Sequence, residues 1–197
     1  YPLNVLIILY TLLCLWLITP SLIYGSQVKF NPNDAKSLRD SLLVIAENNW
    51  EMPQKDIIEH MNKIAYVESL GKINAVQHGG GSGRGMFQYE TGYKQGGHTA
   101  INRLINQFDF YPTFLDGLVA NNYDVSGLSQ DAQEALFLAD KLQDPSASFK
   151  GIENDSQLKK EWFEEHYAGP DSLRTEKYGL FDRQLKDYYG KKNKKTK

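Results

Sequence analysis

Residues 57–71 read IIEHMNKIAYVESLG, and this stretch decides how the centre of the chain folds. The apolar side chains from Ile57 to Ile64 recur at the spacing of an amphipathic helix, which Gly71 then ends. At about 100° per residue, eleven steps bring Glu68 to within roughly 20° of Ile57, so its carboxyl faces the buried side. Burial and the negative end of the helix dipole both raise the pKa of such a carboxyl, which can then donate a proton near neutral pH. A glutamate just off the apolar stripe would instead reach solvent.

Helical spacing also appears on both sides of this stretch. A first helix is expected from Asp34, and Met52-Pro53 breaks it. Residues 71–99 are rich in glycine and lack periodicity, which predicts loops or a small irregular sheet. Further helices are expected over 101–108, 134–142 behind a capping box at Asp131–Glu134, 158–166, and from Asp171 to Tyr189. The fold class is therefore mainly α, a helical domain with a glycine-rich loop or small sheet beside a cleft.

The composition fits one globular domain with an appendage. The chain has 197 residues, and 41% of its residues are hydrophobic, which is enough for a core. A formal net charge of −2 gives no reason to expect nucleic acid as a partner. Basic residues gather at 191–197, which predicts a disordered, solvated tail or contact with an anionic wall or membrane surface.

Metal and disulfide chemistry are not expected in the globular part. Cys14 is the only cysteine, and it lies inside an apolar N-terminal segment. The four histidines show no metal-ligand spacing. We therefore predict no metal and no cofactor.

The N-terminal segment has the composition of a membrane-targeting element. Residues 3–18 form an uncharged, mainly apolar run, and the apolar character resumes at 22–24. The stretch 3–24 is long enough for a transmembrane anchor and equally fits a signal peptide followed by small residues. We assign 1–26 to an anchor or signal peptide and 27–190 to the globular domain. Either interpretation predicts a periplasmic or extracytoplasmic location, membrane-anchored or secreted.

Four short motifs follow one another along the globular part. They are Glu68-Ser69, Asn74-Ala75-Val76, Gly85-Met86-Phe87-Gln88 and His166-Tyr167-Ala168-Gly169. Over residues 35–170 they resemble the soluble lytic transglycosylases and goose-type lysozymes, which share a Glu-Ser pair at a helix end, a Gly-Leu-Met/Phe-Gln turn and a Tyr-Asn-Ala-Gly segment. The resemblance implies an α+β lysozyme-like fold. The compact size and the His-Tyr-Ala-Gly-Pro ending look like those of a phage virion-associated member.

The resemblance implies a lytic transglycosylase that acts on the glycan strands of peptidoglycan. Glu68 would protonate the oxygen of the β-1,4 bond between MurNAc and GlcNAc, while the acetamido group of the sugar supports the developing positive charge. The deprotonated Glu68 would then activate the sugar's own 6-hydroxyl, which closes a 1,6-anhydro ring. This mechanism requires no second carboxylate.

The resemblance also implies substrate-binding residues, each with a structural alternative. Ser69 would contact the acetamido or peptide region, or complete the helix. Gln88 would present its amide to sugar hydroxyls, or bond to the main chain. Met86 and Phe87 would lie along the floor of the cleft, although apolar side chains of this kind more often belong to a core.

Two aromatic residues compete for the role of supporting Glu68. The family has a tyrosine that forms a hydrogen bond to the acid, and direct alignment places His166 at that position and Tyr167 after it. A protonated His166 would lower the pKa of Glu68 and oppose its protonated state. The expected partner is therefore Tyr167 or a neutral His166.

Two alternative functions stay open. Glu90 lies two residues after Gln88, where goose-type lysozymes carry an acidic residue that positions a water. An inverting muramidase would result if Glu90 points into the cleft; otherwise Glu90 is an exposed loop residue. The other alternative is a non-catalytic glycan-binding or assembly module that has kept the cleft.

Overall fold

The computed structural model of the protein describes residues 30–167 and 170–195. The expected anchor or signal peptide at 1–26 lies outside the described residues, as do Ala168-Gly169 of the last motif. Among the residues described, no helix is both long and apolar enough to span a bilayer.

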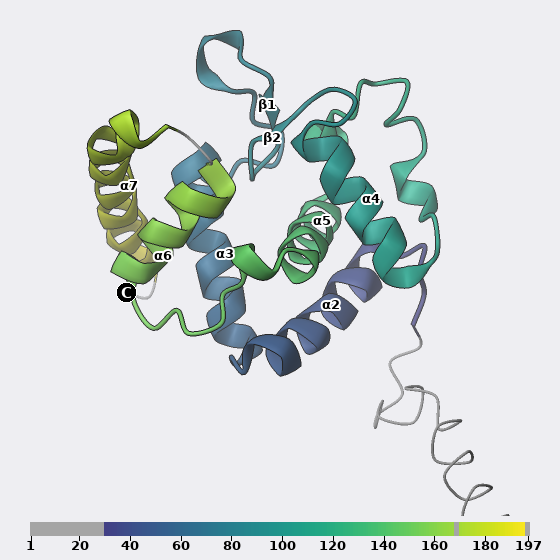
Figure 1. Ribbon diagram of the computed structural model, residues 1–197, viewed down its shortest axis with the longest axis horizontal. Helices are drawn as coiled ribbons and strands as arrows, with labels where there is room; N and C mark the ends of the chain where they lie inside the picture. Colours follow the sequence, from purple (N-terminus) through teal and green to yellow (C-terminus); the bar gives the residue numbers. More distant parts are fainter. Residues whose placement is uncertain (1–29, 168–169, 196–197) are drawn as a thin grey trace, which may run out of the picture. The chain divides into compact units, whose positions relative to one another are not determined.

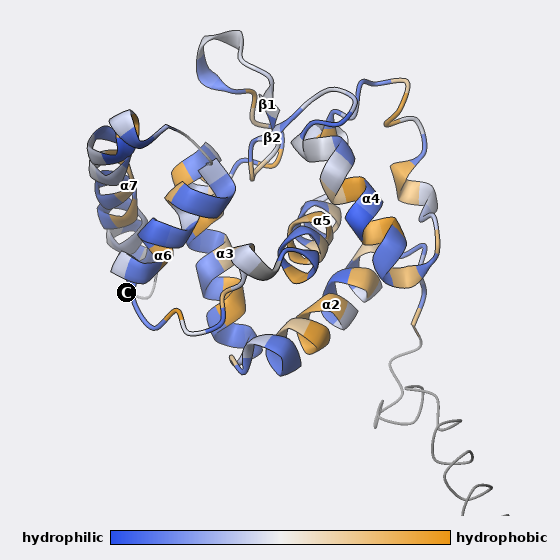
Figure 2. Ribbon diagram, viewed as in Figure 1, coloured by the Kyte–Doolittle hydropathy of each residue, from blue (hydrophilic) through white to orange (hydrophobic). Residues whose placement is uncertain are grey.

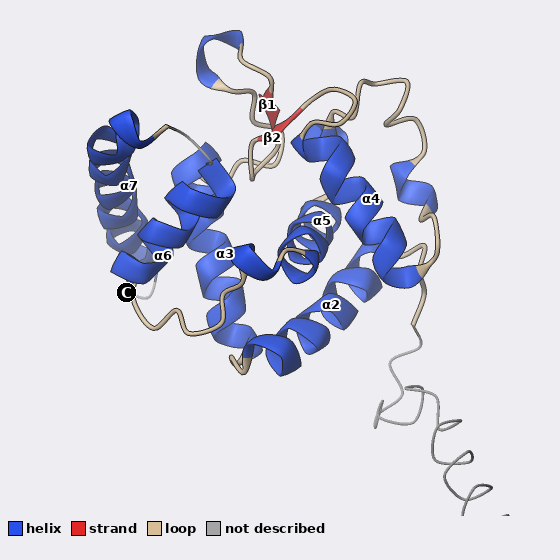
Figure 3. Ribbon diagram, viewed as in Figure 1, coloured by secondary structure: helices blue, strands red, loops and turns tan. Residues whose placement is uncertain are grey.

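The described chain is mainly helical with a small sheet, which confirms the predicted fold class; Figure 1 and Figure 3 show the arrangement. The main elements are α2 (Ala35–Trp50), α3 (Gln54–Ser69), β1 (Gly83–Arg84), β2 (Tyr89–Glu90), α4 (Gly96–Phe108), α5 (Gln130–Gln143), α6 (Asp155–Glu161) and α7 (Arg174–Lys195). Shorter helices between them are η2 (His78–Gly80), η3 (Thr113–Leu115), η4 (Val125–Gly127), η5 (Pro145–Ala147), η6 (Trp162–Tyr167) and η7 (Asp171–Leu173). The two strands form within the glycine-rich region where a small sheet was expected.

The ends of the first two helices follow from local side-chain and backbone chemistry. Asp34 caps α2, because its Oδ2 atom accepts a hydrogen bond from a backbone N–H of the first turn at 3.2 Å. α3 ends because Leu70 and Gly71 both take left-handed φ angles, 59° and 73°. Glu68 therefore lies in the last turn of α3, as the sequence predicts.

The start of α5 corrects one expectation from the sequence. The capping box predicted at 131–134 does not form, because Oγ of Ser129 caps the helix and accepts a hydrogen bond from a backbone N–H at 3.3 Å. Asp131 and Glu134 instead bind the guanidinium of Arg39 in α2. Their charges join two helices rather than complete the turn to which they belong.

α5 is the central helix of the domain. Its residues 135–139 have no exposed surface, so this segment is buried on every side. α2 and α4 pack against it, and Figure 1 shows α5 enclosed by these helices and α3. α3 in turn packs against α2 and α7. Figure 2 shows that α7 is mainly hydrophilic, and its contribution to the core comes from Phe181 and Leu185.

A short hairpin carries the Gly85–Gln88 motif to the centre of the domain. Its strands pair antiparallel, with the partners Gly83–Glu90 and Arg84–Tyr89. Gly85 has a φ of 75°, and a Cβ atom there would lie 2.4 Å from Oε1 of Gln133. The same Oε1 atom accepts a hydrogen bond from Met86 N at 2.8 Å. This position therefore requires glycine, and α5 holds the turn through Gln133.

The basic C-terminal segment is helical as far as it is described. α7 continues to Lys195, so residues 191–195 do not form the disordered tail predicted for 191–197. Nζ of Lys192 lies 2.8 Å from Glu59 of α3, and this ion pair ties the end of α7 to the neighbouring helix. The sequence alone does not reveal that Glu59 lies beside Lys192.

Candidate active site

Glu68 occupies a largely buried position at the end of α3. Its side chain is 15% exposed, and its Oε1 atom accepts a hydrogen bond from Nε1 of Trp162 at 2.5 Å. Burial raises the pKa of Glu68 to about 7, although the Trp162 hydrogen bond and the charge of Lys177 act in the opposite direction. This confirms the predicted rise in pKa. Oε2 accepts no hydrogen bond from the described residues, so it is the oxygen available to carry the proton.

The residues facing Glu68 come from a π-helical turn. η6 continues α6 as a π-helix over Trp162–Tyr167. In an α-helix, residues five apart lie about 140° apart around the axis. Here the wider turn brings the rings of Trp162 and Tyr167 to a centroid distance of 5.6 Å. The π-helix therefore brings both rings to one side, and π-turns of this kind are often found at functional sites.

His166 lies beside Glu68 as a neutral ring. Burial and the nearby charge of Lys141 lower the pKa of His166 to about 3. Its Nε2 atom lies 2.9 Å from the carbonyl oxygen of Phe87, to which it donates, and 3.9 Å from Oε1 of Glu68. Because the ring is neutral, this second contact is not an ion pair and leaves Glu68 free to stay protonated.

The hydrogen bond to Glu68 comes from a residue that the sequence did not single out for this role. Neither His166 nor Tyr167, the two expected partners, forms it; Trp162 does. Tyr167 instead packs against the Trp162 ring. Nζ of Lys177 lies 5.1 Å from the centroid of the Tyr167 ring. Trp162 lies within the helix expected over 158–166, where an indole is usually a core residue.

Ser69 and Met86 have structural roles. Oγ of Ser69 lies 2.9 Å from the carbonyl oxygens of both Ala65 and Met86, so it joins the end of α3 to the hairpin turn. The side chain of Met86 is buried in the core. Neither residue lines the cavity beside Glu68, in contrast to the substrate contacts expected for them.

Phe87 and Gln88 do line that cavity. The Phe87 ring is also part of the core, because it stacks on Phe137 of α5 at a centroid distance of 4.2 Å. Gln88 takes a left-handed φ of 53°, and its Nε2 atom donates a hydrogen bond to Gly85 O at 2.8 Å. The Gln88 amide therefore stabilises its own turn, which is the main-chain alternative given for this residue. Gln88 also borders the cavity.

The cavity has a volume of about 460 Å³. Its lining consists of Glu68, Gln77, Phe87, Gln88, Tyr89, Glu90, Gly96, Thr99, Arg103, Asp140, Glu165, His166 and Tyr167. Of the predicted site residues, Glu90 is the most exposed, and it borders the same space as Glu68. The structure thus brings together residues from the hairpin, α3, α4, α5 and η6.

Three hydrogen-bonded side chains that line the cavity, Tyr89, Arg103 and Asp140, were not identified from the sequence. Arg103 donates a hydrogen bond to Oδ1 of Asp140 at 2.8 Å, and the hydroxyl of Tyr89 donates to Oδ2 of the same carboxylate at 3.2 Å. Burial raises the pKa of Asp140 and, more strongly, that of Tyr89. These residues belong to α4, α5 and β2, so no local motif could have revealed them.

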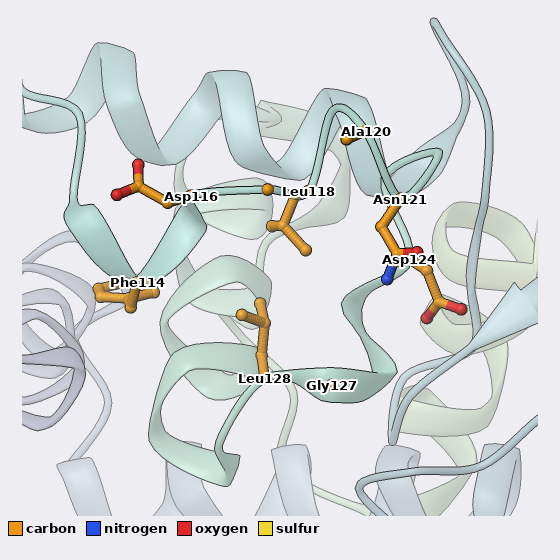
Figure 4. Close-up of a pocket in the computed structure, with 9 residues that line it drawn as sticks. Phe114, Asp116, Leu118, Ala120, Asn121, Asp124, Gly127 and Leu128 are labelled. Carbon is orange, nitrogen blue, oxygen red and sulfur yellow. The ribbon is translucent and has the colours of Figure 1, made fainter.

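A cavity of about 420 Å³ also lies beneath the loop between α4 and α5 (Figure 4). Leu118 and Leu128 point toward one another across it, and the carboxylate of Asp116 points away. Asp124 already accepts hydrogen bonds from Ser126 N and Oγ at 2.8 and 2.6 Å. This cavity lacks a group with the chemical character of Glu68.

Comparisons with protein-family models, with curated proteins and with solved structures found no match to this chain. The resemblance to lytic transglycosylases and goose-type lysozymes therefore depends on the four sequence motifs alone. A function must be argued from the side chains that surround Glu68.

Proposed function

We propose that the protein is a peptidoglycan lytic transglycosylase in which Glu68 is the general acid and base. The observation that carries the proposal is a carboxyl with a pKa of about 7 that borders a cavity and is held by an indole N–H. Near neutral pH such a group exists in both protonation states, so it can donate and later accept a proton. The order of the four motifs supports the same reaction.

The reaction begins when the proton on Oε2 of Glu68 passes to the oxygen of a β-1,4 bond between MurNAc and GlcNAc. That bond breaks, and the acetamido oxygen of the MurNAc residue supports the positive charge at the anomeric carbon. The Glu68 carboxylate then removes the proton of the 6-hydroxyl, whose oxygen attacks the anomeric carbon. Glu68 regains its proton, and the product ends in a 1,6-anhydro ring.

The other carboxylates of the cavity are less suited to this role. Asp140 is bound by Arg103 and Tyr89. Glu165 accepts a hydrogen bond from Ser146 at 2.9 Å. Among the acidic side chains that line the cavity, Glu68 is thus the one that has both a pKa of about 7 and a carboxyl oxygen to which the described residues donate no hydrogen bond.

Glu90 supports a second candidate, an inverting muramidase. It borders the same cavity as Glu68, and a carboxylate there could activate a water on the opposite face of the sugar. The two reactions differ in their product, because hydrolysis adds a water and leaves a reducing end, whereas the transglycosylase product is lighter by one water.

The test measures the clearing of purified peptidoglycan by the full chain and by Glu68→Gln, with the products analysed by mass spectrometry. We expect wild-type protein to release 1,6-anhydro products and Glu68→Gln to lose activity by a factor of about 1,000 or more, since the amide carries no transferable proton. Glu176→Gln is the matched control, because that side chain is 72% exposed and does not border the cavity.

Three outcomes would contradict the proposal in different ways. Clearing that survives Glu68→Gln would exclude Glu68 as the acid. Reducing ends that disappear in Glu90→Gln would favour the muramidase. Wild-type protein that binds peptidoglycan but never clears it would favour a non-catalytic glycan-binding module.

A further inference from the structure

Acidic side chains outnumber basic ones in the lining of the Glu68 cavity. Besides Glu68 itself, the lining contains the carboxyl groups of Glu90, Asp140 and Glu165. Arg103 is the one lysine or arginine among the described residues of this lining. The charge that a bound molecule meets therefore depends on which of these groups neutralise one another.

The positive charge of Arg103 is already compensated by neighbouring carboxylates. Its guanidinium lies 2.8 Å from Oδ1 of Asp140 and 3.3 Å from Oδ2 of Asp144. His166 adds no charge to the lining, because burial lowers the pKa of its ring to about 3. The described lining therefore offers a bound molecule no unpaired cation.

Two lysines lie behind the lining, and each is paired with an acid. Lys141 forms the buried ion pair with Glu161, and Nζ of Lys177 lies 4.0 Å from Oε1 of Glu176. Neither lysine lines the cavity. Each of these positive charges therefore brings a negative charge with it.

Glu90 and Glu165 are the acids of the lining that have no cationic partner. Both residues are exposed, and neither forms an ion pair with a lysine, arginine or histidine of the described chain. Oε2 of Glu165 lies 2.9 Å from Oγ of Ser146, a contact that holds the carboxylate without neutralising it. The cavity thus carries two uncompensated negative charges at neutral pH.

The MurNAc sugar that Glu68 would cleave carries one substituent that can be charged. Its lactyl group, beside the acetamido group, ends in a carboxyl. In a strand without stem peptides this carboxyl is a free carboxylate, whereas a stem converts it into a neutral amide and places its own charges further from the ring. The ring must enter the cavity for its glycosidic oxygen to meet Glu68, so the lactyl group lies in the cavity or at its mouth.

The small size of the cavity makes charge repulsion independent of how the lactyl group is turned. A volume of about 460 Å³ is that of a cube with an edge of roughly 8 Å, which is shorter than the Debye length of about 10 Å in 0.1 M salt. A lactyl carboxylate in this space is therefore within range of both Glu90 and Glu165. Like charges brought together in this way oppose binding and discriminate between ligands.

We propose that Glu90 and Glu165 make the site selective for MurNAc residues whose lactyl group is amide-linked to a stem peptide, and against residues with a free lactyl carboxylate. This inference rests on the proposed function, because it takes the glycan cleaved at Glu68 as the ligand. In this role the two carboxylates repel a charge and exchange no proton with the substrate. Hydrolysis of the lactyl amide, which removes the stem, yields a poorer substrate, so the strand is cut at Glu68 before its stems are removed.

The test compares the cleavage of two synthetic hexasaccharides of alternating GlcNAc and MurNAc by the full chain. The lactyl groups are free acids in one and methylamides in the other, and the uncharged methylamide stands in for the stem linkage. At low ionic strength, kcat/KM for the methylamide is expected to exceed that for the free acid about fivefold. The two values should converge in about 0.5 M salt, where screening shortens the range of the repulsion.

Glu165→Gln is the variant of choice, because Glu90 has an alternative catalytic role. It removes one of the two charges and should lower the ratio of the two kcat/KM values to about twofold at low salt. Glu165→Asp keeps the charge and should keep the ratio. Glu176→Gln is the surface control, because that side chain is 72% exposed and lies outside the lining. A general loss of activity cancels from the ratio, since both substrates are compared on the same variant.

Equal kcat/KM values for the two hexasaccharides in wild-type protein at low salt overturn the selectivity, while cleavage of both leaves the proposed function standing. A ratio that Glu165→Gln leaves unchanged, or that Glu176→Gln lowers equally, overturns the assignment to the carboxylates of the lining. Wild-type protein that cuts neither hexasaccharide nor intact peptidoglycan overturns both proposals.

Discussion

Glu68 holds a proton that an ordinary glutamate would have lost, and this affects the stability of the whole protein. Burial raises its pKa from the ordinary value of 4.5 to about 7. At a pH between these two pKa values, the folded protein binds more protons at Glu68 than the unfolded chain does. Stability therefore falls as pH rises through this window, because the charged carboxylate must be kept in a poorly solvated place.

Glu68→Gln is expected to become more stabilising as pH rises. Relative to wild type, its free energy of unfolding should increase by about 3 kcal/mol from pH 4 to pH 8, since one pK unit corresponds to about 1.4 kcal/mol. Urea denaturation at both pH values measures the difference. A difference that stays constant with pH would show that Glu68 is not a buried acid of raised pKa.

Glu59→Gln on the same helix provides a control of opposite sign. Burial favours protonation of Glu59, but hydrogen bonds from Lys192 and Tyr188 outweigh this effect and lower its pKa. The ionised group thus stabilises the protein above its ordinary titration range and loses this effect as pH falls. Glu59→Gln should therefore become more destabilising as pH rises.

Trp162→Phe tests the hydrogen bond that holds Glu68. The indole N–H favours the ionised carboxylate, so its removal should raise the pKa of Glu68 further above 7. The alkaline limb of the pH profile of kcat/KM, where the acid loses its proton, is then expected to move up by about one pH unit. Tyr167→Phe removes a hydroxyl that makes no bond to Glu68 and should leave this limb in place. A shift in Tyr167→Phe alone would restore the tyrosine to the role first expected of it.

Glu68 and Trp162 show which roles of single residues can be predicted from the sequence and which cannot. The position of Glu68 follows from helical periodicity, because its angle to Ile57 depends on local geometry alone. The role of Trp162 depends on the distance between two segments 94 positions apart in sequence. Ser69 and Met86 differ from their expected roles for the same reason, since the hairpin turn packs directly against the end of α3.

Among the elements, η6 has the strongest effect on the site. A π-turn corresponds to one additional residue in an α-helix. We expect deletion of Glu164 to restore α-helical spacing and to rotate His166 and Tyr167 away from the positions that Trp162 now shares with them. Activity on peptidoglycan should fall about 100-fold or more, since small misplacements of a site carry costs of this size. Far-UV circular dichroism should show that the helix content is kept.

Glu164→Ala is the matched control for this deletion. It removes the same side chain, which is 34% exposed and pairs with Arg174, but keeps the length of the turn. Activity close to wild type in Glu164→Ala, with loss in the deletion variant, would assign the effect to the backbone. Similar losses in both variants would contradict a role for the π-turn.

Helices were predictable in this chain, but their irregularities were not. The spans of α2 and α3 follow from apolar periodicity, and the glycine-rich region contains the expected small sheet. α4 begins at Gly96, although apolar spacing predicts a helix only from residue 101 and loops or sheet up to residue 99. The π-turn leaves no mark in the periodicity, because Leu158, Trp162 and His166 also fit an ordinary helix. The start of α5 was misassigned because Asp131 has a charged partner in α2, whereas Ser129 has the free hydroxyl that caps the helix.

In the described part of the molecule, the site lies where α5 meets the helices that carry Glu68 and Trp162. The contacts that join α5 to this region include the stack of Phe87 on Phe137, and the ion pair between Lys141 and Glu161 of α6. Both members of the ion pair are buried, and Oε2 of Glu161 has no hydrogen-bond partner.

The Lys141–Glu161 pair should therefore behave as a coupled unit. Lys141→Met leaves a buried carboxylate without its partner and is expected to cost about 3 kcal/mol in urea denaturation. Lys141→Met combined with Glu161→Leu removes both charges and should come within about 1 kcal/mol of wild type. Additive losses in the double variant would contradict this coupling.

In Lys141→Met the pKa of His166 should also rise, because the lysine charge helps burial to keep that ring neutral. NMR titration of the imidazole measures the change. A pair behind the cavity would then influence both the stability of the core and the electrostatics beside Glu68.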